Sequence, residues 1–220
     1  MSNKRINMVC YADDAAIFAE NENDLQRQLF KLYQVCRELN ITTSVEKTKS
    51  MTMTREPIRC KLIVEDKPIE QVMQFQYLGM NMSSCHDPTK DLRDQINKAS
   101  ATSGCLREIV WANGYMQKDS KIKIYKTCVR PIMTYAIETR EDTNKTKRLL
   151  LVAEMKVPRS IASKTRRDHV RKIDIREQCD VQDIVRWGRQ RRRQWYNHVK
   201  TLGEDRLPRV ALEGMPVAAR

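Results

Sequence analysis

The tetrapeptide Tyr11-Ala12-Asp13-Asp14 holds the residues of this chain best suited to chemistry. Two adjacent carboxylates supply the hard oxygen ligands that divalent cations prefer, and a phosphate group can share such a cation. Small and apolar residues flank the pair at positions 8–10 and 15–19. These runs predict two short strands joined by a tight turn, with both acids at its tip. The alternative is an ordinary solvent-exposed turn, because Asp favours turns for its own backbone hydrogen bonding.

The residues after this hairpin predict a mixed domain. Asn21 or Asn23 is a candidate N-cap for a helix that ends at Asn40. Its apolar positions follow the spacing of one buried helix face: 25, 29, 32, 36 and 39. Four later runs are typical of short strands: 41–45, 50–54, 61–64 and 75–82. A hairpin, a helix and further strands in this order favour an α+β domain with an antiparallel sheet.

From Asp87 onward the pattern becomes helical. Apolar spacing predicts helices over 92–110, 122–129 and 144–155. Pro131 should end or kink the second of these helices, and Pro158 should interrupt the chain after the third.

A last long helix is predicted from Asp180, its expected cap, to about residue 202. At 100° per residue, one face is an apolar stripe formed by positions 181, 184, 188, 195, 199 and 202. The opposite side carries a basic ridge of Arg186, Arg189, Arg193 and Lys200, with no acidic residue from Arg186 to Lys200 to neutralise it. Arginine binds phosphate oxygens bidentately, so the ridge predicts contact with a polyanion. The alternative is the solvated face of an ordinary amphipathic helix.

The formal net charge of +13 lies entirely in the second half of the chain. Residues 1–110 carry 15 basic and 15 acidic side chains, whereas residues 111–220 carry 26 and 13. Such asymmetry predicts that the second half binds nucleic acid.

Composition favours a folded protein inside the cell, in the nucleus or the cytoplasm. Hydrophobic residues make up 40% of the chain, and no apolar run has the length of a membrane helix or the features of a signal peptide. The seven cysteines are widely spaced without a Cys-x-x-Cys pair. We therefore expect no membrane partner, and reduced thiols without a disulfide partner or a zinc site.

Five separated blocks resemble, in order, the reverse transcriptases of non-LTR (LINE-type) retrotransposons: 11–14, 39–49, 75–79, 124–139 and 165–176. The resemblance implies an RNA-directed DNA polymerase that transfers nucleotides with two Mg²⁺ ions, on an RNA template and a DNA primer. It implies an α+β N-terminal half, a partial polymerase palm of antiparallel hairpins plus a helix, followed by an all-α thumb and a basic helical extension. The corresponding ranges are 1–84, 85–142 and 143–220.

The resemblance also implies roles for individual residues. Asp13 and Asp14 correspond to the paired catalytic, metal-binding aspartates of the palm, and Lys47 to a lysine near the nucleotide phosphates. Tyr11 and Ala12 would approach the primer terminus or the incoming nucleotide. The hairpin that grips the primer would contribute Phe75, Tyr77, Leu78 and Gly79.

The third catalytic aspartate of that family comes from a strand well upstream of the paired aspartates, and only ten residues precede Tyr11. We therefore expect a fragment with an incomplete metal site that is inactive alone. The alternative is a noncatalytic nucleic-acid-binding remnant that uses the basic C-terminal helices. A third interpretation is a translated relic without a selected role.

Overall fold

The computed structural model describes residues 6–54, 58–85 and 87–214. The chain divides into two compact units, Met1–His86 with Val199–Arg220, and Asp87–His198. The division into a palm, a thumb and an extension stays a prediction.

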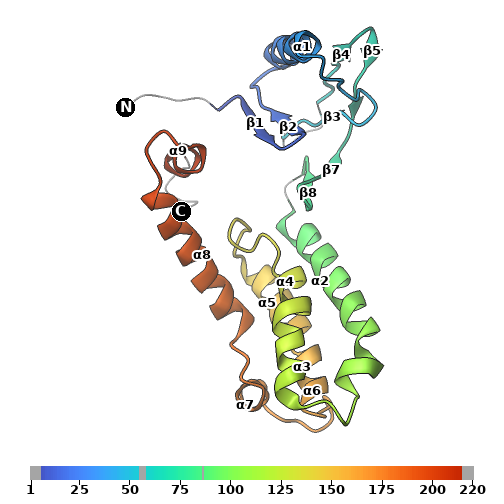
Figure 1. Ribbon diagram of the computed structural model, residues 1–220, viewed down its shortest axis with the longest axis vertical. Helices are drawn as coiled ribbons and strands as arrows, with labels where there is room; N and C mark the ends of the chain where they lie inside the picture. Colours follow the sequence, from blue (N-terminus) through green and yellow to red (C-terminus); the bar gives the residue numbers. More distant parts are fainter. Residues whose placement is uncertain (1–5, 55–57, 86, 215–220) are drawn as a thin grey trace. The chain divides into compact units, whose positions relative to one another are not determined.

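The predicted hairpin is present at the start of the first unit. Strand β1 (Met8–Tyr11) is followed directly by β2 (Asp14–Ile17) (Figure 1). The two strands pair antiparallel, with Tyr11 opposite Asp14. Ala12 and Asp13 form the two-residue loop, in which Ala12 has a φ of 51°. A positive φ costs a residue with a Cβ atom about 1 kcal/mol. The tight strand connection therefore imposes this conformation against the preference of Ala12.

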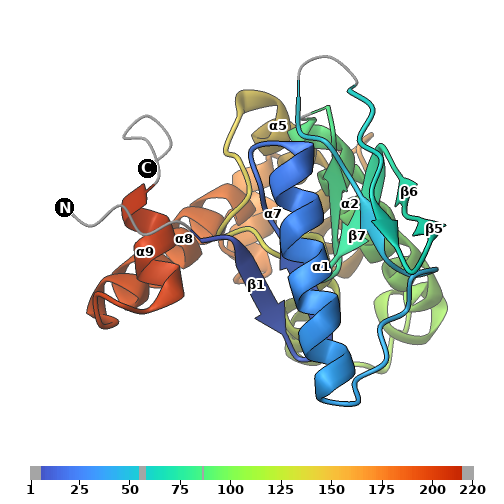
Figure 2. The same ribbon diagram turned by 90° about the horizontal axis from the view of Figure 1, so that it is seen from above.

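The predicted helix follows as α1 (Glu22–Glu38), which Figure 2 shows along its length. Asn21 is its N-cap, because the side chain of Asn21 accepts a hydrogen bond of 2.9 Å from the backbone N–H of Asp24. The helix ends at Glu38 with Leu39 as its C-cap, and Asn40 reverses the chain with a φ of 55°. Both ends of this helix were predicted correctly.

A small core joins α1 to the extended segment that follows it. Leu25, Leu29 and Tyr33 pack against four buried residues, Cys60, Leu62, Val64 and Ile69. The side-chain amide of Gln26 also donates to the carbonyl of Ile63 at 2.8 Å and accepts from its N–H at 2.9 Å. An amide that satisfies both backbone groups of one strand residue fixes the height of α1 along that strand.

The remaining strands of the first unit are short and pair only two at a time. They are β3 (Lys49–Ser50), β4 (Ile63–Val64), β5 (Lys67–Pro68), β6 (Glu70–Gln71), β7 (Gln74–Tyr77) and β8 (Met80–Ser83). The pairs β4–β5 and β7–β8 are antiparallel hairpins, and β3–β6 is parallel. Across the described part of the chain, each pair is a separate two-stranded sheet.

The predicted strand at residues 41–45 is wrong, because this segment pairs with no described strand. The backbone N–H of Thr48 donates to the carbonyl of Ser44 at 3.1 Å, so the segment bends into a turn. Preference for β structure reflects packing against a neighbouring strand, which these β-branched residues do not have.

The second unit is helical. Its helices are α2 (Pro88–Cys105), α3 (Lys118–Ile124), α4 (Arg130–Met133), α5 (Asn144–Glu154), α6 (Lys156–Ile161), α7 (Lys172–Gln178) and most of α8 (Ile184–Thr201). A π-helical turn, Arg107–Trp111, follows α2, and another, Tyr125–Val129, joins α3 to α4. The run ends at Met133, two residues after Pro131. A last helix, α9 (Leu207–Gly214), belongs to the other unit. In the part of the chain described, no helix is long and apolar enough to cross a membrane.

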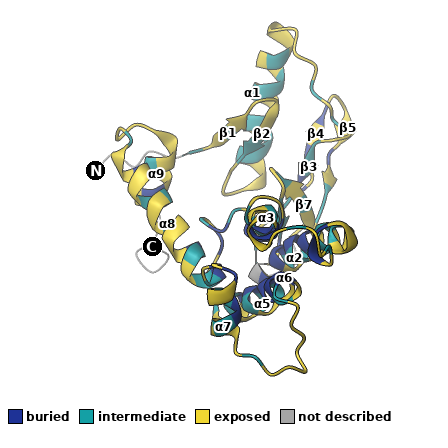
Figure 3. Cartoon of the chain, turned by 60° about the horizontal axis from the view of Figure 1, so that its bottom comes forward, coloured by how far each residue is buried: buried dark blue, intermediate teal, exposed yellow. Residues whose placement is uncertain are grey.

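The core of the second unit lies where α2 meets α4 and α5, and where α6 meets α3, α5 and α7. Figure 3 shows the buried residues on these helices. The apolar stripe predicted for α8 is buried or half-buried at all its positions. At one of them, Gly188, an added Cβ atom would lie 2.6 Å from Cδ1 of the buried Ile137. A side chain at position 188 would therefore require Ile137 to shift.

A buried ion pair ties α2 to the segment after α4. The Nη2 of Arg140 lies 2.5 Å from Oδ2 of Asp91, and both residues are buried. The Nε and Nη1 atoms of Arg140 have no hydrogen-bond partner in the described residues. Asp91 therefore supplies the counter-charge that makes a buried guanidinium tolerable.

We expect Asp91→Asn to destabilise the protein by about 3 kcal/mol, because it leaves the charge of Arg140 buried without compensation. The matched control is Asp180→Asn, which makes the same chemical change at an exposed ion pair with Lys126 and should cost less than about 1 kcal/mol. Urea denaturation of the two variants measures the difference. Equal losses would show that the Asp91–Arg140 pair is no more important than a surface pair.

A second buried carboxylate, Glu154, sits at the junction of α5, α7 and α8. Its Oε2 accepts hydrogen bonds from Arg176 at 2.5 and 3.2 Å, and Nη1 of Arg176 lies 2.9 Å from Asp183. Asp183 also accepts from the backbone N–H groups of Val185 and Arg186, at 2.9 and 3.1 Å. Asp183 thus caps α8 and joins it to the buried carboxylate.

The prediction that Asp180 caps this helix is wrong. Asp180 has a φ of 45° in the turn after α7, and its side chain pairs with Lys126 at 3.0 Å. The helix begins at Ile184 because the chain must first reverse, which it does with a hydrogen bond from the N–H of Val181 to the carbonyl of Arg176.

Burial raises the pKa of Glu154 to about 7 from an ordinary value of 4.5, although its bonds to Arg176 oppose the shift. The folded state therefore holds a proton that the unfolded state releases from about pH 4.5 upward. The contribution of protonated Glu154 to the free energy of unfolding is fully present below pH 4.5 and is lost as the pH rises through 7.

We expect Glu154→Gln to remove this loss, because glutamine keeps an oxygen for Arg176 and cannot ionise. The free energy of unfolding of the unmodified chain should fall by about 2 kcal/mol more than that of the variant between pH 5 and pH 8. Urea titrations of both proteins at each pH give the comparison. The same pH dependence in both proteins would mean that Glu154 does not titrate in this range.

Candidate active site and nucleic-acid interface

The hairpin β1–β2 presents Tyr11, Ala12, Asp13 and Asp14 together at its tip. All four residues are exposed, and the exposed fraction of Tyr11 is 65%. Neither carboxylate has a hydrogen-bond or ion-pair partner among the described residues. Because the strands fix the backbone and leave the carboxylates unengaged, the tip can offer both groups to an external ligand.

These two carboxylates do not by themselves fit a two-cation centre. Such a centre needs carboxylates that clamp both cations at once. Within residues 6–54, 58–85 and 87–214, no three His, Cys, Asp or Glu side chains gather where they could hold a metal ion. The described residues therefore gather no complete ligand set for a metal ion around Asp13 and Asp14.

Lys47 lies in a turn that is separate from the hairpin. The turn covers residues 45–47 and is closed by the hydrogen bonds from the N–H and hydroxyl of Thr48 to the carbonyl of Ser44. The Lys47 side chain is exposed and has no partner in the described part of the chain. The structure thus leaves its ammonium group available but forms no bond between it and either Asp13 or Asp14.

The hairpin β7–β8 contains the second set of predicted substrate-binding residues. Phe75 lies opposite Met82 and Tyr77 opposite Met80 in its register, so these four side chains share one half-buried face. The loop residues Leu78 and Gly79 have φ angles of 46° and 77°. Positive φ at both positions defines a type I′ turn, which glycine at the second position makes easier to form. The hairpin is confirmed, and its role as a primer grip stays a prediction.

The basic residues predicted on the last helix are exposed on α8. They are Arg186, Arg189, Arg193 and Lys200. Of these, Arg186 and Arg193 have guanidinium groups without a partner among the described residues. These two side chains can bind an external anion without first breaking an internal bond.

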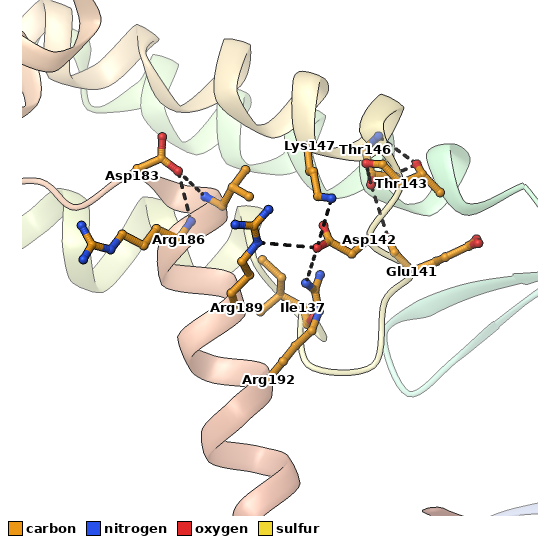
Figure 4. A network of polar contacts seen from close by, with 11 residues as sticks. Ile137, Glu141, Asp142, Thr143, Thr146, Lys147, Asp183, Arg186, Arg189 and Arg192 are labelled. Atoms are coloured by element: carbon orange, nitrogen blue, oxygen red, sulfur yellow. Dashed lines mark hydrogen bonds and ion pairs between the residues drawn. The ribbon is translucent and has the colours of Figure 1, made fainter. Parts of the chain in front are cut away.

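Although the sequence from Arg186 to Lys200 contains no acid, the fold brings one to Arg189. The acid comes from the segment before α5, where Oδ2 of Asp142 lies 4.0 Å from Arg189, 3.1 Å from Arg192 and 3.5 Å from Lys147 (Figure 4). Glu138 of the same segment pairs with Arg191 at 3.1 Å. Nothing within the α8 sequence could indicate these partners, because they lie about 50 residues away along the chain.

Trp187 is held on the same helix by two cations. The guanidinium carbons of Arg130 and Arg191 lie 4.9 and 5.9 Å from the centre of its ring. Its π-face is therefore already covered by cation–π contacts. The arginines therefore occupy the ring surface on which a nucleic-acid base would stack.

Comparisons with known proteins agree with the chemistry of the hairpin. Residues 1–82 match the family model described as reverse transcriptase (RNA-dependent DNA polymerase). An uncharacterized transposon-derived protein of Caenorhabditis elegans is 19% identical over 213 residues, which cover 94% of this chain and 76% of that protein. No solved structure matches the chain at a significant level. Residues 1–82, which include the Asp13–Asp14 hairpin and β7, are therefore reverse-transcriptase-like.

Proposed function

We propose that this chain is part of an RNA-directed DNA polymerase of the non-LTR retrotransposon type, to which it contributes the paired aspartates. The observation that carries the proposal is the β1–β2 hairpin, which presents Asp13 and Asp14 with unengaged carboxylates inside the segment that matches reverse transcriptases. The transposon-derived relative supports the same origin for the rest of the chain. The substrates would be an RNA template, a DNA primer and deoxynucleoside triphosphates.

The exposure of the hairpin supports a role within a larger assembly. A two-stranded hairpin alone is marginally stable in water. This hairpin and the residue after it leave Met8, Tyr11 and Phe18 exposed by 44, 65 and 49%. Further strands packed against these apolar side chains would stabilise the hairpin, and the same strands could supply the missing carboxylate.

In the intact enzyme Asp13 and Asp14 would hold Mg²⁺, which supplies charge stabilisation for nucleotidyl transfer. The exposed ammonium group of Lys47 would attract the phosphates of the incoming nucleotide. Tyr11, Ala12 and the β7–β8 hairpin would lie along the primer. The helices of residues 85–142 would act as the thumb that holds the template–primer duplex.

We expect the purified chain to extend a DNA primer on an RNA template no better than its Asp13→Asn and Asp14→Asn variants, because the described residues supply only two carboxylates. Incorporation of labelled nucleotide with Mg²⁺ measures this. Robust extension that either substitution abolishes would show that the metal site is complete, which would overturn the incomplete-site interpretation while supporting polymerase function.

A chimeric protein tests whether the aspartates of this chain act when the metal site is complete. The upstream half of an active non-LTR reverse transcriptase, ending before its own paired aspartates, is joined to residue 6 of this chain. Primer extension should return, and Asp13→Asn or Asp14→Asn should lower it by about 100-fold or more, since a bound cation contributes several kcal/mol. A chimera that is active and indifferent to both substitutions would contradict the assigned role of the pair.

A second candidate function is noncatalytic nucleic-acid binding by the basic helices of the second unit. The observation that favours it is the pair of unpartnered guanidinium groups, Arg186 and Arg193, on one side of α8. They lie seven residues apart, two helical turns along the same face. Phosphates of a single strand could contact both.

We expect the double variant Arg186→Ala/Arg193→Ala to lower the slope of log Kd against log salt by about 1.4 for a single-stranded RNA, because each lost phosphate contact accounts for ~0.7. The matched control, Lys31→Ala/Arg37→Ala, removes two exposed cations from α1. Fluorescence anisotropy over a range of salt concentrations gives the slopes. If the two double variants gave the same slope as the unmodified chain, the α8 arginines would be only a solvated face.

A further inference from the structure

A groove runs between α2 and α5 on the surface of the second unit. Its floor is aliphatic and includes Ile96, Leu149, Val152 and Ala153. The groove has a volume of about 280 Å³, and the exposed fraction of Val152 is 45%. Binding of a partner in the groove could bury the exposed part of the Val152 side chain.

The rim of this groove is basic. Arg93 of α2, Lys145 and Arg148 of α5, and Lys156 at the start of α6 line it, and all four side chains are exposed. None of the four has a hydrogen-bond or ion-pair partner among the described residues. No acidic residue lines the groove. The nearby Asp87 caps α2; its hydrogen bonds with Thr89 lower the pKa of its carboxyl group, and the charges of Lys145 and Arg93 lower this pKa further.

The spacing of these residues indicates the shape of the partner. Lys145, Arg148 and Val152 lie on one face of α5, three and four residues apart. From Lys145 to Val152 the α5 side of the groove extends over about 10 Å, the length of two helical turns. A helix laid in the groove would place apolar side chains on the floor and carboxylates beside the cations at the rim.

The aliphatic floor distinguishes a peptide from a nucleic acid. Phosphates are bound by charged and polar donors, and exposed bases stack on aromatic rings. No aromatic residue lines this groove. Four unpaired cations around an apolar floor are therefore complementary to a chain that carries both carboxylates and aliphatic side chains.

We propose that the α2–α5 groove is a docking site for an acidic amphipathic helical segment of a partner protein. None of the groove residues belongs to the Asp13–Asp14 hairpin or to the α8 ridge, although α2 is one of the helices assigned above to the proposed thumb. Binding is driven by burial of leucine-type side chains on Val152 and its neighbours, and the rim cations select an acidic partner.

The test uses the full chain and a fluorescein-labelled synthetic peptide of about 16 residues, with leucines spaced three and four apart and Glu or Asp between them. Fluorescence anisotropy should show saturable binding. Val152→Asp, which puts a negative charge on the floor, and Arg148→Glu, which reverses one rim charge, should each weaken binding by about tenfold or more. The matched control is Lys123→Glu, an exposed charge reversal on α3 outside the groove, which should leave the Kd unchanged.

Three outcomes would overturn the proposal. The first is no peptide binding, or binding that Val152→Asp leaves unchanged in a variant with normal circular dichroism. The second is equal binding of a peptide of the same composition with its leucines scrambled, which would show charge attraction alone. The third is an RNA–DNA duplex that displaces the peptide and is weakened by Arg148→Glu but not by Val152→Asp, which would make the groove a nucleic-acid surface.

Discussion

The arrangement of the second unit depends on Arg176, which lies between two carboxylates. It bonds to the buried Glu154 of α5 and to Asp183, the residue that caps α8. A buried carboxylate without a partner would cost several kcal/mol, so α7 must lie where its arginine reaches Glu154. The same guanidinium then positions the first turn of α8 through Asp183. One side chain therefore fixes where the basic helix begins and on which residues its apolar face packs.

The two units differ in how they bury their apolar side chains. Residues 87–198 bury a continuous core around Leu92, Tyr125 and Ile175. Residues 6–85 bury a small cluster beneath α1 and leave apolar residues exposed on the β1–β2 hairpin. The continuous core of residues 87–198 supports the helices that carry the charged surfaces. The hairpin that carries the aspartates leaves Met8 and Tyr11 exposed, so further strands packed against it, as proposed for the larger assembly, would stabilise it.

Several basic side chains of α8 are paired with acids that lie far from them in the sequence and close to them in space. Asp142 and Glu138 neutralise part of α8, so that Arg189, Arg191 and Arg192 hold the helix to the segment before α5. Among the described residues, cations without such partners include Arg186 and Arg193 on α8 and the four at the rim of the α2–α5 groove. The paired cations serve stability, and the unpaired ones are those available to a ligand.

Sequence patterns that extend over only a few residues predicted several helices and strands of this protein. The hairpin at Asp13–Asp14, the helix capped by Asn21 and the apolar stripe through Gly188 all follow from spacing, capping and turn chemistry. The same local rules misplaced the cap of α8 and predicted a strand at 41–45. Three properties come from the tertiary structure. It brings acids to some of the α8 cations, it buries Glu154 and so raises the pKa of this residue, and it places a basic rim around an apolar groove. These properties depend on residues up to about 50 positions apart, and burial and charge pairing are set by the neighbours in space, which spacing along the chain does not specify.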